Sequence, residues 1–342
     1  MTDGCVISDA RTRVGFIVGP TGIGKSALTL NIAERLGAEI VNADSRLLYR
    51  GMDIGTAKPG PAERRRVPHH LIDVCAPDQP LDVARFRDLA RNTIEEVARR
   101  NRPVIVTGGS GFYLKVLKRG IFSGPPAAPE IRRELHVLAA EHGVEYLYRK
   151  LSEVDAESAG RIGPRDLYRI VRALEVFRLT GTTISAHQRR HAFAEPVYVS
   201  LTVGLHLPRE RLYQAIDRRF DEMIAARLVE ETRALLAAGY RPQAPPLSTI
   251  GYKHVAAALA GELTMDEAVA TAKRDTRRLA KRQLTWFRRD PEIVWVDAER
   301  GAQQALELFE GFFSSPPAPG AALQGPGTGV EGRSAAVQNV ER

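Results

Sequence analysis

Residues 19–26 combine glycines with a lysine and a serine, a combination that binds phosphate groups. The segment fits the pattern G-x-x-x-x-G-K-[ST] without a mismatch and consists of Gly19, Pro20, Thr21, Gly22, Ile23, Gly24, Lys25 and Ser26. Glycine keeps side chains away from an anion, Lys25 adds a point charge, and Ser26 can hold Mg²⁺ beside the phosphates. The pattern predicts a polyphosphate or diphosphate site, and it leaves open which reaction takes place there.

The segments on either side of this phosphate loop indicate how it is held. Residues 14–18 form a short apolar run typical of a strand, and residues 27–36 carry apolar side chains at helical spacing before Gly37, a typical C-cap. A strand, a glycine loop and a helix start in this order direct backbone N–H groups at an anion. This context argues against a chance glycine turn.

Asp44 is a candidate functional acid. It follows the second predicted strand, residues 38–43. Ligands gather at the carboxyl ends of parallel strands, so we expect Asp44 beside the phosphate loop. The alternative role is an N-cap for a helix over residues 45–49.

A third predicted strand, residues 103–107, leads into a glycine-rich turn that contains Ser110, which should face the same edge of the sheet. This strand lacks the magnesium-binding aspartate that is usual at such a strand end in ATP-hydrolysing enzymes. Its absence disfavours ordinary phosphoryl transfer, and it leaves Asp44 as the only strand-end acid that the sequence predicts.

Composition bounds the class of protein and its partners. The 342 residues are 44% apolar and carry a net charge of +8, which favours a soluble protein of about two domains with phosphate-rich partners. No apolar run reaches about 18 residues, so no membrane span is expected. The two cysteines, Cys5 and Cys75, allow no disulfide framework or zinc pattern, and a cytoplasmic location is expected.

The order of patterns along the chain predicts an α/β protein with a P-loop NTPase-like parallel sheet core and an inserted α-helical subdomain. The core comprises residues 13–122 and 197–313, because strand patterns resume after residue 197. Within the core, one apolar helix is expected from Arg209 to a cap at Gly239. The insertion, residues 123–196, opens with a proline-rich linker and has helical periodicity near 130–141, 144–151 and 166–180. Residues 1–12 and 314–342 are expected to be disordered.

Basic residues concentrate in two predicted helices. Arg165, Arg169 and Arg172 should share one face of the helix near 166–180, and few acids lie among them, which favours nucleic-acid phosphates over a solvated face. The helix over residues 265–289 is expected to begin at a capping box in which Thr264 is followed by Asp266 and Glu267. It carries eight lysines and arginines with Trp286 and Phe287 near its end. Basic and aromatic residues together are typical of a nucleic-acid groove, although Phe287 is expected in the core.

Several segments together resemble bacterial tRNA dimethylallyltransferases over about residues 14–296. They are the phosphate loop, residues 42–45 with Tyr49, and residues 52–59, 68–73, 108–113, 172–176, 250–252 and 280–286. The segments 53–59 and 281–286 are the most specific for this family. Relatives often have arginine where Ala215 stands and glycine where Arg227 stands.

The resemblance implies a prenyltransferase that uses Mg²⁺, dimethylallyl diphosphate and the anticodon stem-loop of tRNA. The acceptor would be the adenosine 3′ of the anticodon in tRNAs that read codons beginning with U. Asp44 would be the base, Arg219 would stabilise the diphosphate, and Ser110 would stand where many relatives have threonine. The resemblance places tRNA contacts at Asp44, Ser45, Arg46, Leu47, Ser110, Arg132, Tyr168, Arg169, Ile170, Val171 and Arg172.

Two other classes of function share some of these features. A small-molecule kinase would bind ATP in the same loop, but it needs a strand-end magnesium aspartate and does not need the basic helices. A non-catalytic RNA-binding module would use the basic helices alone, and it would not depend on Asp44. A monomer is the favoured oligomeric state.

Overall fold

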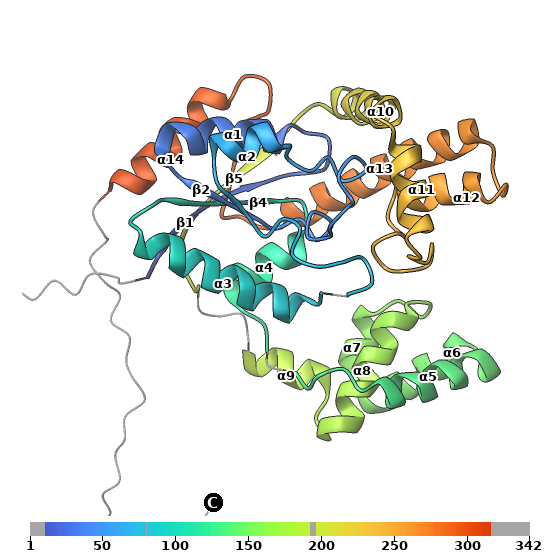
Figure 1. The fold of residues 1–342 in the computed structure, drawn as a ribbon. Helices are drawn as coiled ribbons and strands as arrows, with labels where there is room; N and C mark the ends of the chain where they lie inside the picture. The colour runs from blue at the N-terminus through green and yellow to red at the C-terminus, as the bar shows by residue number, and fades with distance from the viewer. Residues whose placement is uncertain (1–10, 80, 123, 192–195, 316–342) are drawn as a thin grey trace, which may run out of the picture.

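The computed structural model describes residues 11–79, 81–122, 124–191 and 196–315 (Figure 1). Apart from residues 11, 12, 314 and 315, the two ends that were expected to be disordered lie outside this description. Within the described ranges, no helix is long and apolar enough to cross a lipid bilayer.

The centre of the molecule is a sheet of six parallel strands in the order β3-β2-β4-β1-β5-β6. The central strand β1 lies between β4 and β5, and Val14 is opposite both Val104 and Ser200. The strands are β1 (Arg13–Val18), β2 (Glu39–Asn42), β3 (His69–His70), β4 (Val104–Gly108), β5 (Val199–His206) and β6 (Ile293–Asp297). The predicted parallel sheet is confirmed, and it resumes with β5 after the helical insertion.

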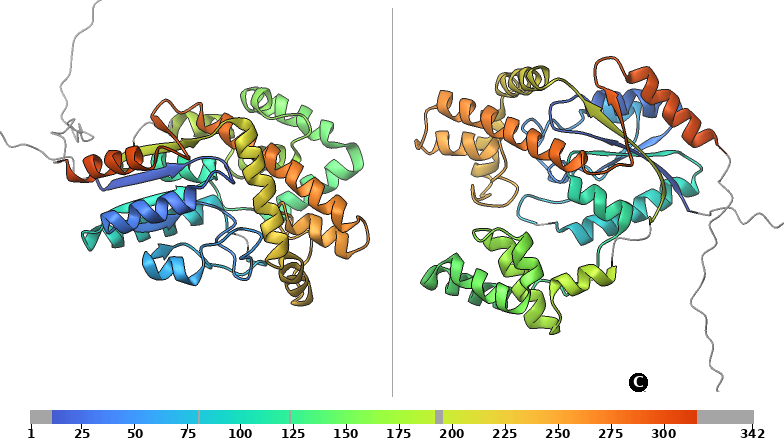
Figure 2. Two further views of the ribbon diagram at one scale, coloured as in Figure 1. Left: turned by 90° about the horizontal axis from the view of Figure 1, so that it is seen from above. Right: turned by 180° about the vertical axis from the view of Figure 1, so that it is seen from behind.

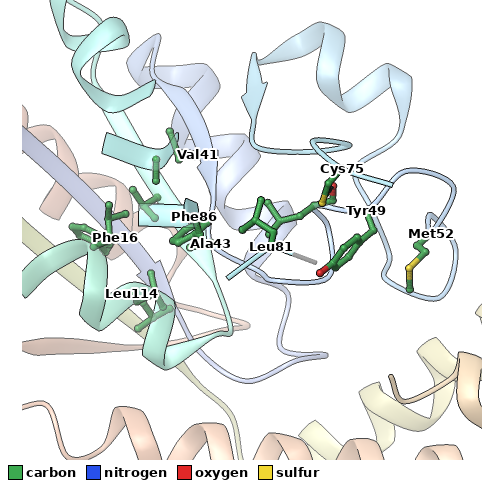
Figure 3. Close-up of a cluster of buried hydrophobic side chains, with 14 of the residues drawn as sticks. Phe16, Val41, Ala43, Tyr49, Met52, Cys75, Leu81, Phe86 and Leu114 are labelled. Atoms are coloured by element: carbon green, nitrogen blue, oxygen red, sulfur yellow. Dashed lines mark hydrogen bonds between the residues drawn. The ribbon is translucent and has the colours of Figure 1, made fainter. Parts of the chain in front are cut away.

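Helices cover both faces of the sheet, as Figures 1 and 2 show. Helices α1 (Lys25–Leu36) and α14 (Ala302–Ser314) cover one face, and α3 (Val83–Arg99) and α4 (Gly111–Arg119) cover the other, while α2 (Pro61–Arg66) precedes β3. Neighbouring residues of β1 point to opposite faces of the sheet. Phe16 belongs to the apolar cluster that contains Phe86 (Figure 3), and Ile17 belongs to the cluster that contains Phe309. Burial on both faces explains why these strands are continuous apolar runs.

The inserted segment has its own apolar core. Leu135, Leu151, Ile170 and Leu174 pack together there. Its helices are α5 (Pro129–His142), α6 (Val144–Val154), α7 (Ala156–Arg161), α8 (Leu167–Thr180) and α9 (Ile184–His191). Sequence periodicity predicted α5, α6 and α8 and missed the two shortest. The proposed boundaries at residues 123 and 196 stay a prediction, because residues 123 and 192–195 are not described.

Four helices extend the core beside the carboxyl ends of the strands: α10 (Arg209–Ala225), α11 (Leu228–Ala237), α12 (Tyr252–Leu259) and α13 (Met265–Phe287). Thr264 and Glu267 form the predicted capping box of α13. One continuous apolar helix was predicted from Arg209 to Gly239, but the chain breaks between α10 and α11. Arg227, in the left-handed region at φ 76°, causes this break.

Arg227→Gly should raise the free energy of unfolding by up to about 1 kcal/mol, because glycine adopts positive φ at little cost. The Arg227–Glu230 ion pair that it removes is long, at 3.9 Å, and exposed, so its loss should cost little. Urea denaturation of both proteins measures the change. A lower midpoint in the glycine variant would contradict this account of the break.

Candidate functional site

A cavity of about 620 Å³ opens at the carboxyl ends of β1, β2 and β4. Its walls come from the phosphate loop, from the turns that follow β2 and β4, and from helices α10 and α13. The side chains and glycines that concern the chemistry are Thr21, Gly22, Asp44, Ser45, Arg46, Ser110, Arg219, Gln283 and Trp286. Open parallel sheets bind ligands at this edge.

Asp44 lies in this cavity, on a backbone held in place by Asn42. The Asn42 amide nitrogen donates to the Asp44 carbonyl at 3.0 Å, and its oxygen accepts from the Asp44 N–H at 2.8 Å. The Asp44 Oδ1 accepts from the Arg46 N–H at 3.0 Å and closes a turn. The helix expected over residues 45–49 is not formed, so the helix-cap interpretation is wrong. Within the described residues, Oδ2 has no hydrogen-bond partner.

Two cations lie close to Asp44. Desolvation lowers the pKa of Lys25 to about 8, while the Asp44 carboxylate acts in the opposite direction and Arg219 lowers it further. Desolvation also lowers the pKa of Arg219, again against the effect of Asp44. Lys25 donates to the Pro20 carbonyl at 2.9 Å. The two desolvated cations would be stabilised by an anion between them.

Arg219 is available to such an anion. Its Nη1 lies 3.5 Å from the Thr21 hydroxyl, and its buried Nε has no hydrogen-bond partner among the described residues. A buried N–H without a partner is costly unless a ligand accepts from it. The predicted position of Arg219 beside the phosphate loop is therefore observed, although a bound diphosphate stays a prediction.

Gln283 joins the two glycine-rich turns of the site. Its Oε1 accepts from the Thr21 N–H at 2.9 Å, and its Nε2 donates to the Gly109 carbonyl at 2.9 Å. A Cβ at Gly109 would lie 2.6 Å from that nitrogen, so only glycine allows this approach. Gln283 belongs to the segment 280–286, which carried part of the resemblance, but no role was predicted for it. Its partners are 262 and 174 residues away, a separation that periodicity cannot reveal.

Ser110 lies where predicted, beside the turn that contains Asp44. Its hydroxyl accepts from the Ser45 N–H at 3.3 Å. The next residue, Gly111, packs closely against the indole of Trp286, which is 43% exposed at the cavity. Phe287 is buried, as expected. An exposed aromatic ring at the mouth of the cavity offers a surface on which a base can stack.

Lys25 and Ser26 do not line the cavity, and Ser26 lies exposed in the first turn of α1. Within the described residues, no three His, Cys, Asp or Glu side chains are grouped to hold a metal. The serine hydroxyl is a hard oxygen donor, and Mg²⁺ commonly takes one or two protein ligands and completes its shell with water and phosphate oxygens. Ser26 therefore fits a Mg²⁺ that is bound together with a diphosphate.

Strand β6 also ends in an acid, Asp297. The expectation that Asp44 is the only acid at a strand end is therefore wrong. The Asp297 Oδ1 accepts from the N–H groups of Glu299 and Arg300 and closes a turn. Strand β6 is at the edge of the sheet, and Asp297 does not line the cavity. Of these two acids, Asp44 is the one that lines it.

The predicted tRNA contacts in the insertion divide into paired, buried and exposed side chains. Arg132 and Arg172 both bind the carboxylate of Glu175, which is fully buried. Ile170 and Val171 are also buried, in the core of the insertion, and their contacts with tRNA stay a prediction. Tyr168 is 76% exposed, and the Arg169 side chain is 69% exposed.

The prediction that Arg165, Arg169 and Arg172 share one face of a helix is wrong for Arg165. Arg165 lies in a turn before α8 and not on the helix, because α8 begins at Leu167 with Asp166 as its N-cap. Arg172 donates to the Pro125 carbonyl as well as to Glu175, and so holds the linker to α8. Of the three arginines of the predicted face, Arg165 and Arg169 are therefore the exposed ones.

Glu175→Gln should lower the free energy of unfolding by about 2 kcal/mol at pH 7, because it leaves two arginines without their carboxylate. Burial acts to raise the pKa of Glu175, but hydrogen bonds from Arg132 and Arg172 prevail and lower it below 4.5. The stability that this carboxylate contributes is thus present above pH 4.5, and it is lost as the pH falls through the lower native value. Urea denaturation between pH 3 and 7 should show a shallower acid loss in the glutamine variant; equal slopes would contradict this account.

Comparison with known proteins identifies the family. The model of the family described as IPP transferase matches residues 47–290. The chain belongs to the IPP transferase family. A tRNA dimethylallyltransferase of Geobacter metallireducens is 48% identical over 305 residues, which cover 89% of this chain and 99% of the relative. A tRNA dimethylallyltransferase of Syntrophobacter fumaroxidans is 49% identical over 292 residues, covering 84% and 85%.

Solved structures of this family have the same fold. The tRNA isopentenylpyrophosphate transferase of Bacillus halodurans superposes with a TM-score of 0.66 at 36% identity, covering 89% of this chain and 97% of that one. A eukaryotic dimethylallyltransferase acting on tRNA has a TM-score of 0.76 at 25% identity and coverages of 90% and 80%. The predicted family and the P-loop NTPase-like core are confirmed.

Proposed function

We propose that this protein transfers a dimethylallyl group from dimethylallyl diphosphate to the exocyclic amine of the adenosine 3′ of the anticodon, in tRNAs that read codons beginning with U. The observation that carries the proposal is the shared cavity, which both Asp44 and Arg219 line beside Thr21 of the phosphate loop. The family supports transfer of a dimethylallyl group to tRNA. A kinase and a non-catalytic RNA-binding module have no such support.

The residues suit a direct displacement. The amine nitrogen forms a bond to the first allylic carbon, the bond from that carbon to oxygen breaks, and its electron pair leaves with diphosphate. The amine is a weak nucleophile because its lone pair is delocalised into the ring, so Asp44 takes its proton as the bond forms. Lys25, Arg219 and the N–H groups of the loop stabilise the departing charge. Mg²⁺ at Ser26 would neutralise part of that charge.

The cavity also offers a place for the prenyl chain and the base. Apolar side chains line it, including Ile216, Phe220, Met223 and Leu279. They exclude water, which would otherwise compete with the amine for the allylic carbon. The adenine must leave its stack to reach Asp44, and Trp286 and Phe112, both exposed at the cavity, can replace lost stacking. We also propose that the protein acts in the cytoplasm as a monomer.

Transfer of labelled dimethylallyl from its diphosphate to undermodified tRNA tests the function. We expect label in the adenosine 3′ of the anticodon and equimolar diphosphate in solution. The matched acceptor is the same tRNA with guanosine at that position, which should stay unlabelled. Failure of the wild-type protein to label the adenosine, with Mg²⁺ present, would refute the proposed reaction.

Arg165→Gln with Arg169→Gln should weaken tRNA binding and reduce the magnitude of its salt slope by about two, if each cation neutralises one phosphate. Both side chains are exposed. The control is Arg211→Gln, since Arg211 is exposed in α10 and pairs with Glu299 away from the cavity. Filter binding over a range of salt concentrations gives the slopes, and an unchanged slope in the double variant would remove these residues from the interface.

A further inference from the structure

Glu231, near the start of α11, binds a turn that lies far from it in the sequence. Its carboxylate oxygens accept from three successive backbone N–H groups, those of Asp53 at 3.0 Å, Ile54 at 2.9 Å and Gly55 at 3.2 Å. Three consecutive N–H groups that point to one place form a concave anion site. In this protein a side chain that is 176 residues beyond Gly55 fills that site.

Tyr252, the first residue of α12, supplies a fourth donor to the same carboxylate. Its hydroxyl lies 2.5 Å from the Glu231 Oε1. Burial raises the pKa of this hydroxyl, and the neighbouring carboxylate raises it further, so the phenol stays a donor. Tyr252 is 1% exposed, and a Cβ at Gly55 would lie 2.6 Å from its ring. The ring and the carboxylate therefore hold Gly55 from two directions.

The turn held in this way forms part of the cavity wall. Gly55 and Thr56 line the cavity, and the Thr56 hydroxyl donates to the Met52 carbonyl at 2.6 Å. Thr249 and Ile250, which lead into α12, line it as well. Neither Glu231 nor Tyr252 is among the described residues that line the cavity. Through Tyr252, a single carboxylate thus joins two wall segments that come from distant parts of the chain.

We propose that Glu231 is a positioning residue for prenyl transfer, which acts through Tyr252 and the 53–55 turn to hold the wall at Gly55 and Thr56 against the substrates. This role rests on the proposed function. A small displacement of this wall should weaken substrate binding in the cavity more than it slows proton transfer to Asp44. The effect should therefore fall mainly on KM, and less on kcat.

Glu231→Gln tests the role, because an amide keeps the size of the side chain but places an NH₂ group against N–H donors. The matched control is Glu230→Gln on the same helix, since among the described residues Glu230 pairs only with the exposed Arg227. Hydrogen–deuterium exchange of peptides that cover residues 52–58 reports the contact without any need for activity. We expect the amides of residues 53–55 to exchange about tenfold faster in Glu231→Gln, and at the wild-type rate in the control.

Steady-state prenyl transfer then reports the function of the contact. Glu231→Gln should lower kcat/KM about tenfold, mostly through KM, the equivalent of one lost hydrogen bond to a charged group. Tyr252→Phe keeps the ring on Gly55 and removes only the hydroxyl, so its effect should be smaller and in the same direction. Because both residues act on one wall, the double variant should be no worse than Glu231→Gln alone.

The outcomes separate this role from the proposed function. If wild type and Glu230→Gln are active and Glu231→Gln has their kinetic constants, the positioning role is overturned whatever the exchange shows. Unchanged exchange at residues 53–55 would overturn the contact itself. If wild type transfers no prenyl group at all, the proposed function fails, and this role fails with it.

Discussion

Asp44→Asn should lower kcat for prenyl transfer about 10²–10⁴-fold, the usual contribution of a positioned general base. The amide cannot take the proton of the adenine amine. Its oxygen can still accept from the Arg46 N–H, and Asn42 still holds the backbone at position 44, so the turn should keep its shape. The substitution therefore removes the proton acceptor and leaves the cavity in place.

The matched control for Asp44 is Asp297→Asn, which changes the other strand-end acid outside the cavity. Single-turnover transfer at saturating substrates should give the wild-type rate for this variant. Thermal unfolding should give melting temperatures within a few degrees for Asp44→Asn and wild type, about the shift expected from a surface substitution. Wild-type turnover by Asp44→Asn would show that another group, or water, takes the proton.

Arg219→Gln should lower kcat about 10²–10³-fold, the range observed when one donor to a developing oxyanion is removed. The charge that grows on the departing diphosphate would lose a desolvated cation. The buried Nε of the guanidinium has no hydrogen-bond partner in the part of the chain that the structure describes, so its removal should not lower the free energy of unfolding. A variant that loses activity without losing stability would separate the catalytic role of Arg219 from a structural one.

The neighbouring Arg218 provides the control for Arg219. Its side chain is 72% exposed and pairs at 3.8 Å with Glu222, so Arg218→Gln should leave kcat unchanged. Loss of the nearby positive charge at 219 should also raise the pKa of Lys25, because Arg219 lowers it in the wild type. Equal kcat values for the two variants would show that Arg219 does not assist the leaving group.

Local patterns predicted the parts of this fold that depend on neighbours in the sequence. The phosphate loop is flanked by β1 and α1 as expected, since apolar runs and helical spacing reflect burial of one short segment. The long helix α13 begins at the predicted capping box, a feature that four consecutive residues determine. The break at Arg227 was missed because the apolar spacing runs straight through it.

The candidate site was predictable to the extent that topology determines it. Once the sheet is parallel, Asp44 and Ser110 must meet at one edge, and the structure places both in the cavity. The arginine face of the insertion was mispredicted for a different reason. Glu175 is visible in the sequence three residues after Arg172, but the sequence does not show that its carboxylate is buried and binds both Arg172 and Arg132.

The amino-acid sequence alone thus determined the phosphate loop, most of the strands and helices, the acid that follows β2 and the family. Only the tertiary structure decided how the cavity is held. Gln283 joins two glycine turns, and Glu231 holds the 53–55 turn, each across more than a hundred residues of chain. The physical reason is that a hydrogen bond depends on distance in space, and folding brings together donors and acceptors whose separation in the sequence leaves no periodic pattern.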